Sequence, residues 1–278
     1  RMDRLEDNLK RTMQVASVIG REFAFRILQT ITGMREEIKS YLLNLQGLEF
    51  IYEKSLFPDL EYIFKHALTQ EVAYNSLLLK RRKEIHEKIG KAMETLYPGR
   101  LEEHYEMLAY HYAQSSNPDK AVQYLDLANQ KVAKLNAMEE AKAYFDGAME
   151  LLDTLPENEE NRQRRFSLLV KQAEVFMLLF KFQEYYDLLI RYEPLARELE
   201  NPELLGAFYG RLGLCHFAFG HYDQGIQTLT KAAKLAEASG NVEEAGYAYV
   251  YWQFCHLDTG DYDRVLSLKE KVLRTLKQ

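Results

Sequence analysis

The chain has 278 residues, of which 47% are hydrophobic and 28% charged, a composition typical of a globular protein with one large or two medium domains. A net charge of -6 gives no overall attraction to nucleic acid or to an anionic membrane, so we expect neither as a partner. Two cysteines make no disulfide framework, and the sequence has no signal segment and no apolar run near the roughly 18 residues of a membrane span, which favours a cytoplasmic protein.

Residues 1 to about 75 mix helical and strand patterns. Apolar residues at three- and four-residue spacing predict helices over 4–18, 25–31 and 36–45. Residues 48–55 and 60–67 are rich in aromatic and branched side chains and predict two short strands, with a turn at 56–59 that carries Pro58. Three helices followed by a β-hairpin are typical of a winged helix.

The third of these helices would be the recognition helix of a DNA-binding winged helix. Its sequence carries Arg35 and Lys39 but also Glu36 and Glu37. Phosphate contacts require a clear excess of positive charge. We therefore do not expect this segment to bind DNA directly.

From Glu71 onward the sequence is helical, with turns marked by proline and glycine, and it repeats. Cys215, His216 and Gly220 recur 40 residues later as Cys255, His256 and Gly260. The tetratricopeptide pattern combines small, bulky and aromatic residues along two helices. The residues that fit it in the two best-matching stretches are Tyr105, Leu108, Ala109, Tyr112, Ala121, Leu125 and Ala128, then Tyr209, Leu212, Gly213, His216, Gly225, Leu229 and Ala232.

The small residues of this pattern matter because paired helices approach to about 8–10 Å only where one side chain is short. A spacing of about 40 residues, instead of the usual 34 or so, predicts longer helices. The sequence leaves open which helices between residues 76 and 153 are the first members of pairs. The architecture predicted from this pattern is a stack of helical hairpins.

The two Cys-His dipeptides could be a metal site or part of the packing. Adjacent residues on a helix point about 100° apart, whereas two ligands from one helix usually lie three or four residues apart. Four ligands could still converge from Cys215, His216, Cys255 and His256 on neighbouring units. We favour packing, with both histidines in the aromatic position of the repeat, and predict no metal.

Three segments together carry a family resemblance: QVASVIGREFAFRILQTITG (14–33), EYIFKHALTQEVAYNSLLLKRRKEIHEKIGKAMETLY (61–97) and the repeats from Leu101. They resemble the region after the ATPase core of bacterial STAND-type signalling ATPases, especially those fused to class III adenylate or guanylate cyclases. The chain is also similar to ATP-dependent transcriptional activators of the maltose-regulator type. The resemblance implies a winged-helix-like domain over 1–75 and a superhelix of tetratricopeptide-like repeats over 76–278.

The resemblance also implies a longer parent protein, and the chain begins with Arg1 and ends at Gln278 within a helical pattern. We therefore expect missing ATPase and output domains to be partners of this region. The sequence has no G-x-x-x-x-G-K-[ST] loop and no cyclase aspartate segments. ATP or ADP is expected only with the missing ATPase domain, and this region is predicted to have no cofactor and no enzymatic activity.

By the same resemblance, His66 matches the winged-helix histidine that reaches the phosphates of bound ADP in related ATPases. The alternative is a histidine that caps the junction between the second strand and the next helix. The basic run KRRKEIHEK (80–88) is either a solvated helix face or a docking surface for the missing ATPase domain.

In tetratricopeptide superhelices the first helix of each pair lines the concave side, which predicts a groove for a protein or peptide partner. The residues selected are Lys171, Glu174, Arg211, Leu214, Phe217, Tyr247, Tyr251 and Phe254. Aromatic residues and arginine are common anchors of protein interfaces. The competing interpretation is that an adjoining superhelical turn buries several of them.

The function predicted from the sequence is a non-catalytic regulatory and protein-interaction module, a sensor arm of a multidomain bacterial ATPase with nucleotide cyclase output. The alternative is the sensor arm of a maltose-regulator-type transcriptional activator. A third hypothesis, an enzyme in its own right, would need a nucleophile with its base, a metal spacing or a phosphate loop, and the sequence contains none above chance.

Overall fold

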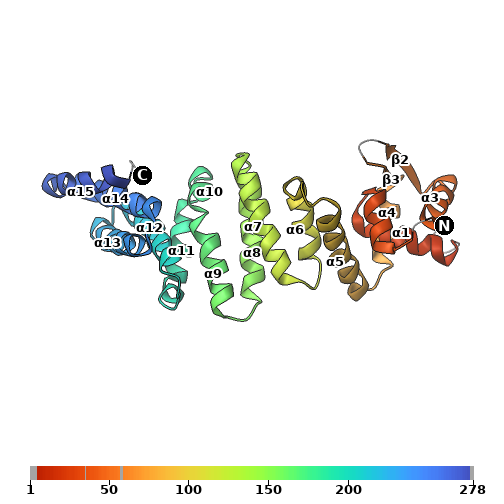
Figure 1. The fold of residues 1–278 in the computed structure, drawn as a ribbon, viewed down its shortest axis with the longest axis horizontal. Helices are drawn as coiled ribbons and strands as arrows, with labels where there is room; N and C mark the ends of the chain where they lie inside the picture. The colour runs from red at the N-terminus through yellow and green to blue at the C-terminus, as the bar shows by residue number, and fades with distance from the viewer. Residues whose placement is uncertain (1–4, 35, 57–58, 276–278) are drawn as a thin grey trace. The chain divides into compact units, whose positions relative to one another are not determined.

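The structure is a computed structural model that describes residues 5–34, 36–56 and 59–275 (Figure 1). Within these residues the chain is mainly α-helical with one small antiparallel sheet, as predicted. It divides into two compact units, Arg1–Lys131 and Val132–Gln278. Helix α5 packs against α1 and α2, so the first unit continues past the predicted boundary after residue 75, and that assignment of domains stays a prediction.

The first unit contains the three helices and two strands predicted near the N-terminus, together with one strand that the sequence did not reveal. Its elements are α1 (Asp7–Ile19), β1 (Glu22–Ala24), α2 (Phe25–Thr32), α3 (Glu37–Gly47), β2 (Ile51–Ser55), β3 (Glu61–Phe64), α4 (Ala67–Asn75), α5 (Leu79–Leu96), the 3-10 helix η2 (Leu101–His104) and α6 (Tyr105–Ala113). Helix α7 (Pro118–Lys134) runs across the division.

The sheet has β3 at its centre, with β1 and β2 on either side and both antiparallel to it. Phe23 of β1 lies opposite Tyr62, and their rings stack with centroids 5.7 Å apart. A three-residue strand is too short to show a period of two, which is why the sequence did not predict β1. Pro58 of the predicted turn lies outside the described residues.

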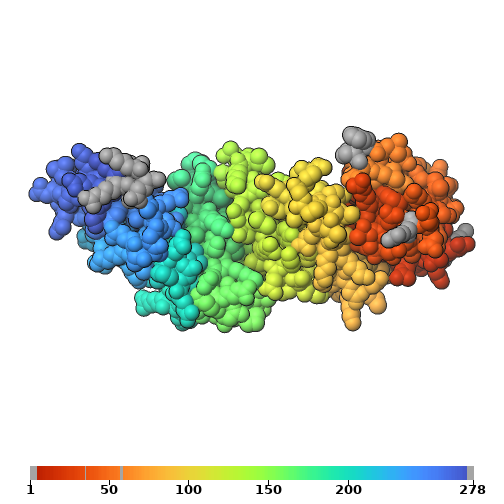
Figure 2. All heavy atoms as spheres, in the orientation of Figure 1, coloured from red at the N-terminus to blue at the C-terminus, as the bar shows by residue number. Residues whose placement is uncertain are grey.

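The core of this part is built from one face of each helix. Helix α1 packs against α2, α3, α4 and α5, and the side chains fill the gaps between the ribbons (Figure 2). The fully buried side chains include Met13, Leu28, Ile38, Leu42 and Phe64. The first four are apolar positions at helical spacing and Phe64 lies on β3, so burial in the helices follows the predicted faces.

A buried pair of histidines joins α5 to α6. His86 Nδ1 lies 2.9 Å from His111 Nδ1, and His86 Nε2 lies 3.2 Å from the hydroxyl of Tyr74 on α4. A hydrogen bond between the two Nδ1 atoms needs one donor and one acceptor, so at least one of the two rings is neutral. Burial, with Arg82 nearby, lowers the pKa of His86 to about 4, and burial beside His86 lowers the pKa of His111 to about 3.

The second unit consists of helices arranged in successive hairpins (Figure 1). They are α8 (Met138–Asp153), α9 (Glu159–Val170), α10 (Ala173–Leu178), α11 (Phe182–Ala196), α12 (Pro202–Ala218), α13 (Tyr222–Ser239), α14 (Val242–Asp258) and α15 (Tyr262–Thr275). Helix α12 packs against α13 and also against α9 and α14, so α9, α12 and α14 form one row.

Asparagine caps mark this row of first helices. The side chains of Asn158, Asn201 and Asn241 each accept a hydrogen bond from a backbone N–H in the first turn, at 2.8–3.0 Å, whereas α8, α11 and α13 have no side-chain cap. Asn117 caps α7 in the same way, at 3.1 Å. The start of α7 is thus capped like those of α9, α12 and α14. This favours α7 as the first helix of a pair, an assignment that the hydrophobic pattern left open.

The small residues of the repeat lie where helices touch most closely. A Cβ added to Gly213 of α12 would lie 2.5 Å from Cγ of Leu229 on α13. A Cβ added to Gly225 of α13 would lie 3.0 Å from Sγ of Cys255 on α14. Both distances are shorter than van der Waals contact, so these positions hold glycine because the neighbouring helix occupies the space.

Three turns, each between the two helices of a hairpin, share one backbone form, although only two of them carry glycine. Gly220 and Gly260 have φ of 73° and 78°, and the residue 40 positions before Gly220 is Phe180, with φ of 57°. The same pair of backbone hydrogen bonds closes all three turns. A phenylalanine pays a conformational cost in this left-handed region that glycine does not, and the Phe180 side chain is 95% exposed.

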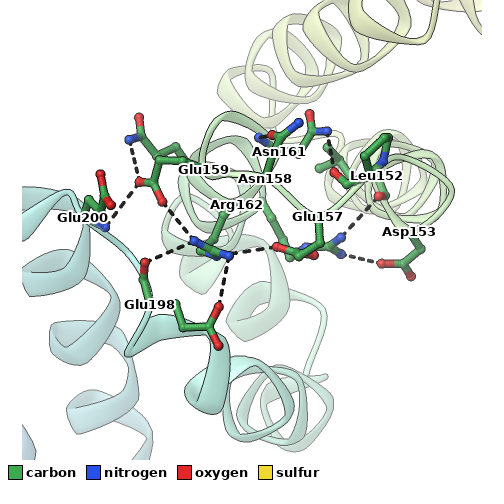
Figure 3. Close-up of polar contacts among 12 residues, drawn as sticks. Leu152, Asp153, Glu157, Asn158, Glu159, Asn161, Arg162, Glu198 and Glu200 are labelled. Atoms are coloured by element: carbon green, nitrogen blue, oxygen red, sulfur yellow. Dashed lines mark hydrogen bonds and ion pairs between the residues drawn. The ribbon is translucent and has the colours of Figure 1, made fainter.

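An arginine joins the beginning of α9 to the segment between α11 and α12 (Figure 3). Arg162 donates to the carboxylates of Glu159 and Glu198, at 3.1 and 3.0 Å, and to the backbone carbonyl of Glu198. Glu157 lies 3.5 Å from its Nε, and the backbone N–H of Glu200 donates to Glu159. These contacts fix where α12 starts relative to α9.

We expect the free energy of unfolding to fall as the pH is lowered from 6.5 towards 4. Histidine in the unfolded chain takes up a proton near pH 6.5, whereas the buried pair stays neutral, so the unfolded state binds more protons in this range. Each of the two histidines should lower stability by about 2 kcal/mol at pH 5 relative to pH 8. Urea unfolding followed by circular dichroism at several pH values measures this slope.

The control for this pH dependence is a pair of variants. His86→Leu/His111→Leu should lose most of the slope, whereas His66→Gln, at an exposed position, should keep it. An identical slope in the wild-type chain and the double variant would contradict a neutral buried pair.

Gly213→Ala should lower the free energy of unfolding by about 1–2 kcal/mol, because overpacking costs roughly 1–3 kcal/mol and the helix propensity of alanine offsets up to about 1. Gly210→Ala, on the same helix, is the matched control. Its added Cβ would lie 3.5 Å from the ring of Tyr247, an ordinary contact, so its stability should rise slightly. Equal changes in thermal unfolding for both variants would refute the close approach at Gly213.

Candidate partner-binding surface

The first helix of the repeat at 159–178 is broken, and the break is closed by side chains. Helix α9 ends at Val170 and α10 begins at Ala173, which leaves carbonyl groups of the last turn without helical partners. Tyr185 of α11 donates its hydroxyl to the carbonyl of Leu169 at 2.9 Å, and Arg211 of α12 donates Nε–H to the carbonyl of Val170 at 3.2 Å. The break is therefore a satisfied structural feature.

Arg211 also makes a bidentate ion pair. Its Nη1 and Nη2 donate to the two carboxylate oxygens of Glu244 on α14, at 2.9 and 2.8 Å, and both side chains are largely buried. The guanidinium lies 4.0 Å from the ring centroid of Tyr247. Burial opposes its charge, but Tyr247 and Glu244 hold the pKa of Arg211 above its usual value. Arg211 of α12 thus contacts the first helices of the hairpins before and after its own.

An aromatic cluster, defined as Phe217, Tyr247, Tyr251 and Phe254, lies on α12 and α14. The ring of Phe217 stacks on that of Phe254, with centroids 5.8 Å apart, and lies 6.0 Å from that of Tyr251. Tyr251 in turn lies 4.9 Å from Tyr247. Phe254 is 39% exposed, and the other three rings are half-buried. Sequence reasoning selected all four residues, and the structure brings them together.

The other predicted groove residues have different surroundings. Leu214 is half-buried on α12, Lys171 follows the end of α9, and Glu174 lies on α10. Lys171 and Glu174 are exposed. The guanidinium of Arg211 already donates hydrogen bonds to Val170 and Glu244. The row of first helices is as predicted, and the role of the eight residues as a groove stays a prediction.

His66 stands between β3 and α4, two residues after the end of the strand. It occupies the N-cap position of α4 and is exposed, but its side chain makes no capping hydrogen bond; its carbonyl accepts from the backbone N–H of Thr69 at 3.0 Å. The proposed side-chain cap is therefore absent, and the contact with ADP stays a prediction for the whole protein.

The basic side chains of residues 80–88 have different partners. Arg81 pairs with Glu84 at 2.8 Å. Arg82 donates to the carbonyls of Leu77 and Asn75, and its guanidinium lies 4.5 Å from the ring of Tyr74. Arg81 and Arg82, two of the four consecutive basic residues, thus form interactions within the chain.

The Cys-His dipeptides are part of the packing. Burial raises the pKa of the Cys215 thiol above its usual value, and burial with nearby Asp258 raises that of Cys255 to about 11. His256 accepts from Trp252 Nε1 at 3.1 Å and lies 3.3 Å from Asp261. In the described part of the chain, no three His, Cys, Asp or Glu residues are placed to hold a metal ion.

Two hollows of the second unit were not anticipated from the sequence. One, of about 660 Å³, is lined by residues 136–140 and by Leu178 and Leu179. The other, of about 300 Å³, lies between α8 and α11 and includes Lys142 and Arg191. Phe180 is exposed and directly follows Leu178 and Leu179, which line the first hollow. It stands where the next two hairpin turns have Gly220 and Gly260, and this difference is the one feature of the sequence that could have pointed to the hollow. Of the helices in the described ranges, none is both long and apolar enough to cross a membrane.

Comparison with known proteins places the chain in a structural class. No protein-family model matches the sequence, and no curated protein matches it. The apo form of RapI matches 99% of this chain and 67% of its own length, with 11% identity and a TM-score of 0.54. A Rap protein complexed with Competence and Sporulation Factor matches 97% of this chain and 77% of its own, with 12% identity and a TM-score of 0.52. At such identities the likeness shows the fold alone.

A third match is a Signal Transduction ATPase with Numerous Domains (STAND) with a tetratricopeptide repeat sensor from Pyrococcus horikoshii. It is 13% identical over 99% of this chain, which spans about half of that protein (51%). Its TM-score of 0.44 supports no conclusion about this chain. The chain is a mainly α protein of tetratricopeptide-like helical repeats with a small N-terminal sheet.

Arg211→Leu should lower the free energy of unfolding by about 2–4 kcal/mol, because it leaves the carboxylate of Glu244 largely buried without its partner. The exposed control Arg197→Leu should change it by less than about 0.5 kcal/mol. Adding Glu244→Leu to Arg211→Leu should cost much less than the two separate losses combined. Urea unfolding measures all four variants, and similar losses for Arg211→Leu and Arg197→Leu would rule out the bridging role.

Proposed function

We propose that this chain is a non-catalytic regulatory module that binds a protein or peptide partner on the face formed by α10, α12 and α14. The observation that carries the proposal is the aromatic cluster, which extends over two adjacent first helices. Aromatic side chains bury much area at a low cost in conformational entropy, and they are the usual anchors of protein interfaces.

The ion pair next to the cluster supports this role in two ways. Glu244 compensates the charge of Arg211, so a partner meets rings without having to strip water from an unpaired cation. The bidentate geometry also holds α12 and α14 in fixed register, so the rings are positioned before a partner arrives. The chemistry favours a partner that presents an aromatic or aliphatic side chain.

The element order of the first unit supports a winged-helix-like domain ahead of the repeats. The sequence α1-β1-α2-α3-β2-β3, with the third strand between the other two, is the arrangement expected of that fold. Together with the resemblance in residues 14–33 and 61–97, it favours a sensor arm of a STAND-type ATPase fused to a nucleotide cyclase. The sensor arm of a maltose-regulator-type activator is the second candidate.

In either parent protein the mechanism would be a shift between two states. A partner that binds the repeats in one state more tightly than in the other displaces the equilibrium by that difference in affinity. His66 would contact ATP or ADP only when the missing ATPase domain supplies the nucleotide. The Rap protein solved with Competence and Sporulation Factor is a precedent for partner binding on a similar fold.

The partner-binding proposal can be tested with random 12-residue peptides displayed on phage. Peptides enriched on the 278-residue chain should contain aromatic or large aliphatic residues. In fluorescence anisotropy, Phe217→Ala and Tyr251→Ala should weaken the binding of an enriched peptide about 5- to 30-fold, the range for an interface anchor. Tyr262→Ala, which removes an exposed ring from α15, should leave it within about twofold.

Phe180→Ala separates this surface from the hollow near Leu178. Weakened binding in Phe180→Ala with unchanged binding in Tyr251→Ala would assign the site to that hollow and overturn the proposal. Failure to enrich any peptide whose binding depends on Phe217 or Tyr251 would also overturn it.

A further inference from the structure

A small hollow in the first unit combines positive charge with an unsatisfied hydroxyl. It is lined by side chains from α1, α2, α5 and the residue after the C-terminal glycine of α2. These are Arg11, Thr12, Val15, Ile31, Thr32, Met34, Arg81, Ile85 and Lys88. All of them belong to the first compact unit.

Thr12 is the unusual member of this set. It is 1% exposed, and its buried Oγ1 has no hydrogen-bond partner among the residues that the structure describes. A threonine within a helix commonly donates to the carbonyl four residues earlier, as Thr32 does to Leu28 at 2.8 Å and Thr95 to Lys91 at 2.9 Å. Thr12 makes no such bond. A buried hydroxyl without a partner is costly, so a ligand or a solvent molecule is needed to satisfy it.

The charges around the hollow indicate what such a ligand is. Arg11 and Lys88 are exposed at its rim, and neither has an ion-pair partner among the described residues. Arg81 pairs with a single carboxylate, that of Glu84. Among the described residues these three cations thus have one ion-pair partner, Glu84, which favours an anion that also accepts a hydrogen bond from a hydroxyl.

The size of the hollow limits the anion. Its volume is about 80 Å³, and a cavity needs roughly 10–15 Å³ to hold one water molecule, so it admits a group of about five or six atoms. Phosphate has five heavy atoms, carries up to two negative charges near neutral pH and accepts hydrogen bonds at every oxygen. The apolar walls formed by Val15, Ile31 and Ile85 strengthen these interactions by excluding water.

We propose that this hollow binds the phosphate group of a small molecule. The hydroxyl of Thr12 donates to one oxygen, and Arg11, Arg81 and Lys88 neutralise the charge. A phosphate monoester would leave its organic part outside, because the hollow has room for the phosphate only. The site lies among α1, α2 and α5, away from His66 at the start of α4, and is independent of the partner-binding surface in the second unit.

The test is a titration of the 278-residue chain with inorganic phosphate and, separately, with glycerol 3-phosphate, at constant ionic strength maintained with sodium chloride. Thermal unfolding and methyl NMR signals of Val15, Ile31 and Ile85 are followed together. Saturable changes in all three methyl signals are expected. Tighter binding of glycerol 3-phosphate would identify a monoester as the natural ligand, and tighter binding of phosphate the free ion.

Three variants connect the binding to the named residues. Lys88→Gln should weaken phosphate binding at least fivefold, and Lys91→Gln, three residues further along α5 and paired with Glu87, should leave it within twofold. Thr12→Val should raise the unfolding temperature of the phosphate-free chain, since it removes the unsatisfied hydroxyl, and should weaken phosphate binding at least threefold. This variant is expected to fold, so its affinity can be measured.

Two results would overturn the proposal. One is an equal response to phosphate and to chloride at the same ionic strength, which would mean general screening only. The other is unchanged phosphate affinity in both Thr12→Val and Lys88→Gln, which would place any binding elsewhere.

Discussion

The second unit depends on one side chain that reaches three helices. Arg211 donates Nε–H to the carbonyl of Val170 at the break between α9 and α10 and binds Glu244 of α14 through Nη1 and Nη2. Its guanidinium also lies over the ring of Tyr247. A break in a helix leaves carbonyl groups that must find donors, and a bidentate ion pair has one permitted geometry. The row of first helices is therefore fixed by polar contacts, whereas the close approach of Gly213 and Leu229 holds α13 against α12.

This constraint shapes the surface beside it. Because the charge of Arg211 is compensated by Glu244, the face of α12 and α14 presents the rings of the aromatic cluster, with Phe254 the most exposed. A surface of rings held by a rigid base suits a partner that inserts apolar side chains, whereas a surface of free charges would suit an oppositely charged one. The proposed function and the architecture of the repeat thus have the same physical origin.

The first unit buries polar side chains among its packed helices. His86 and His111 share a hydrogen bond between their Nδ1 atoms that is lost when both rings are protonated, and among the described residues Thr12 Oγ1 has no hydrogen-bond partner. The histidine pair adds acid sensitivity to the contact between α5 and α6. The unsatisfied threonine, beside Arg11 and Lys88, is the reason to propose a bound phosphate group.

Local spacing in the sequence determined the helical class, the 40-residue repeat, the three helices and hairpin near the N-terminus, and the four aromatic residues that cluster on α12 and α14. These follow from which face of a helix is apolar and where small residues recur, and both can be counted along the chain. Only the tertiary structure decided that Arg211 pairs with Glu244, 33 residues away, that β1 joins the sheet, and that Thr12 Oγ1 is buried with no partner among the described residues. Such outcomes depend on which distant groups packing brings within hydrogen-bond reach, and spacing along one helix or strand carries no information about that distance.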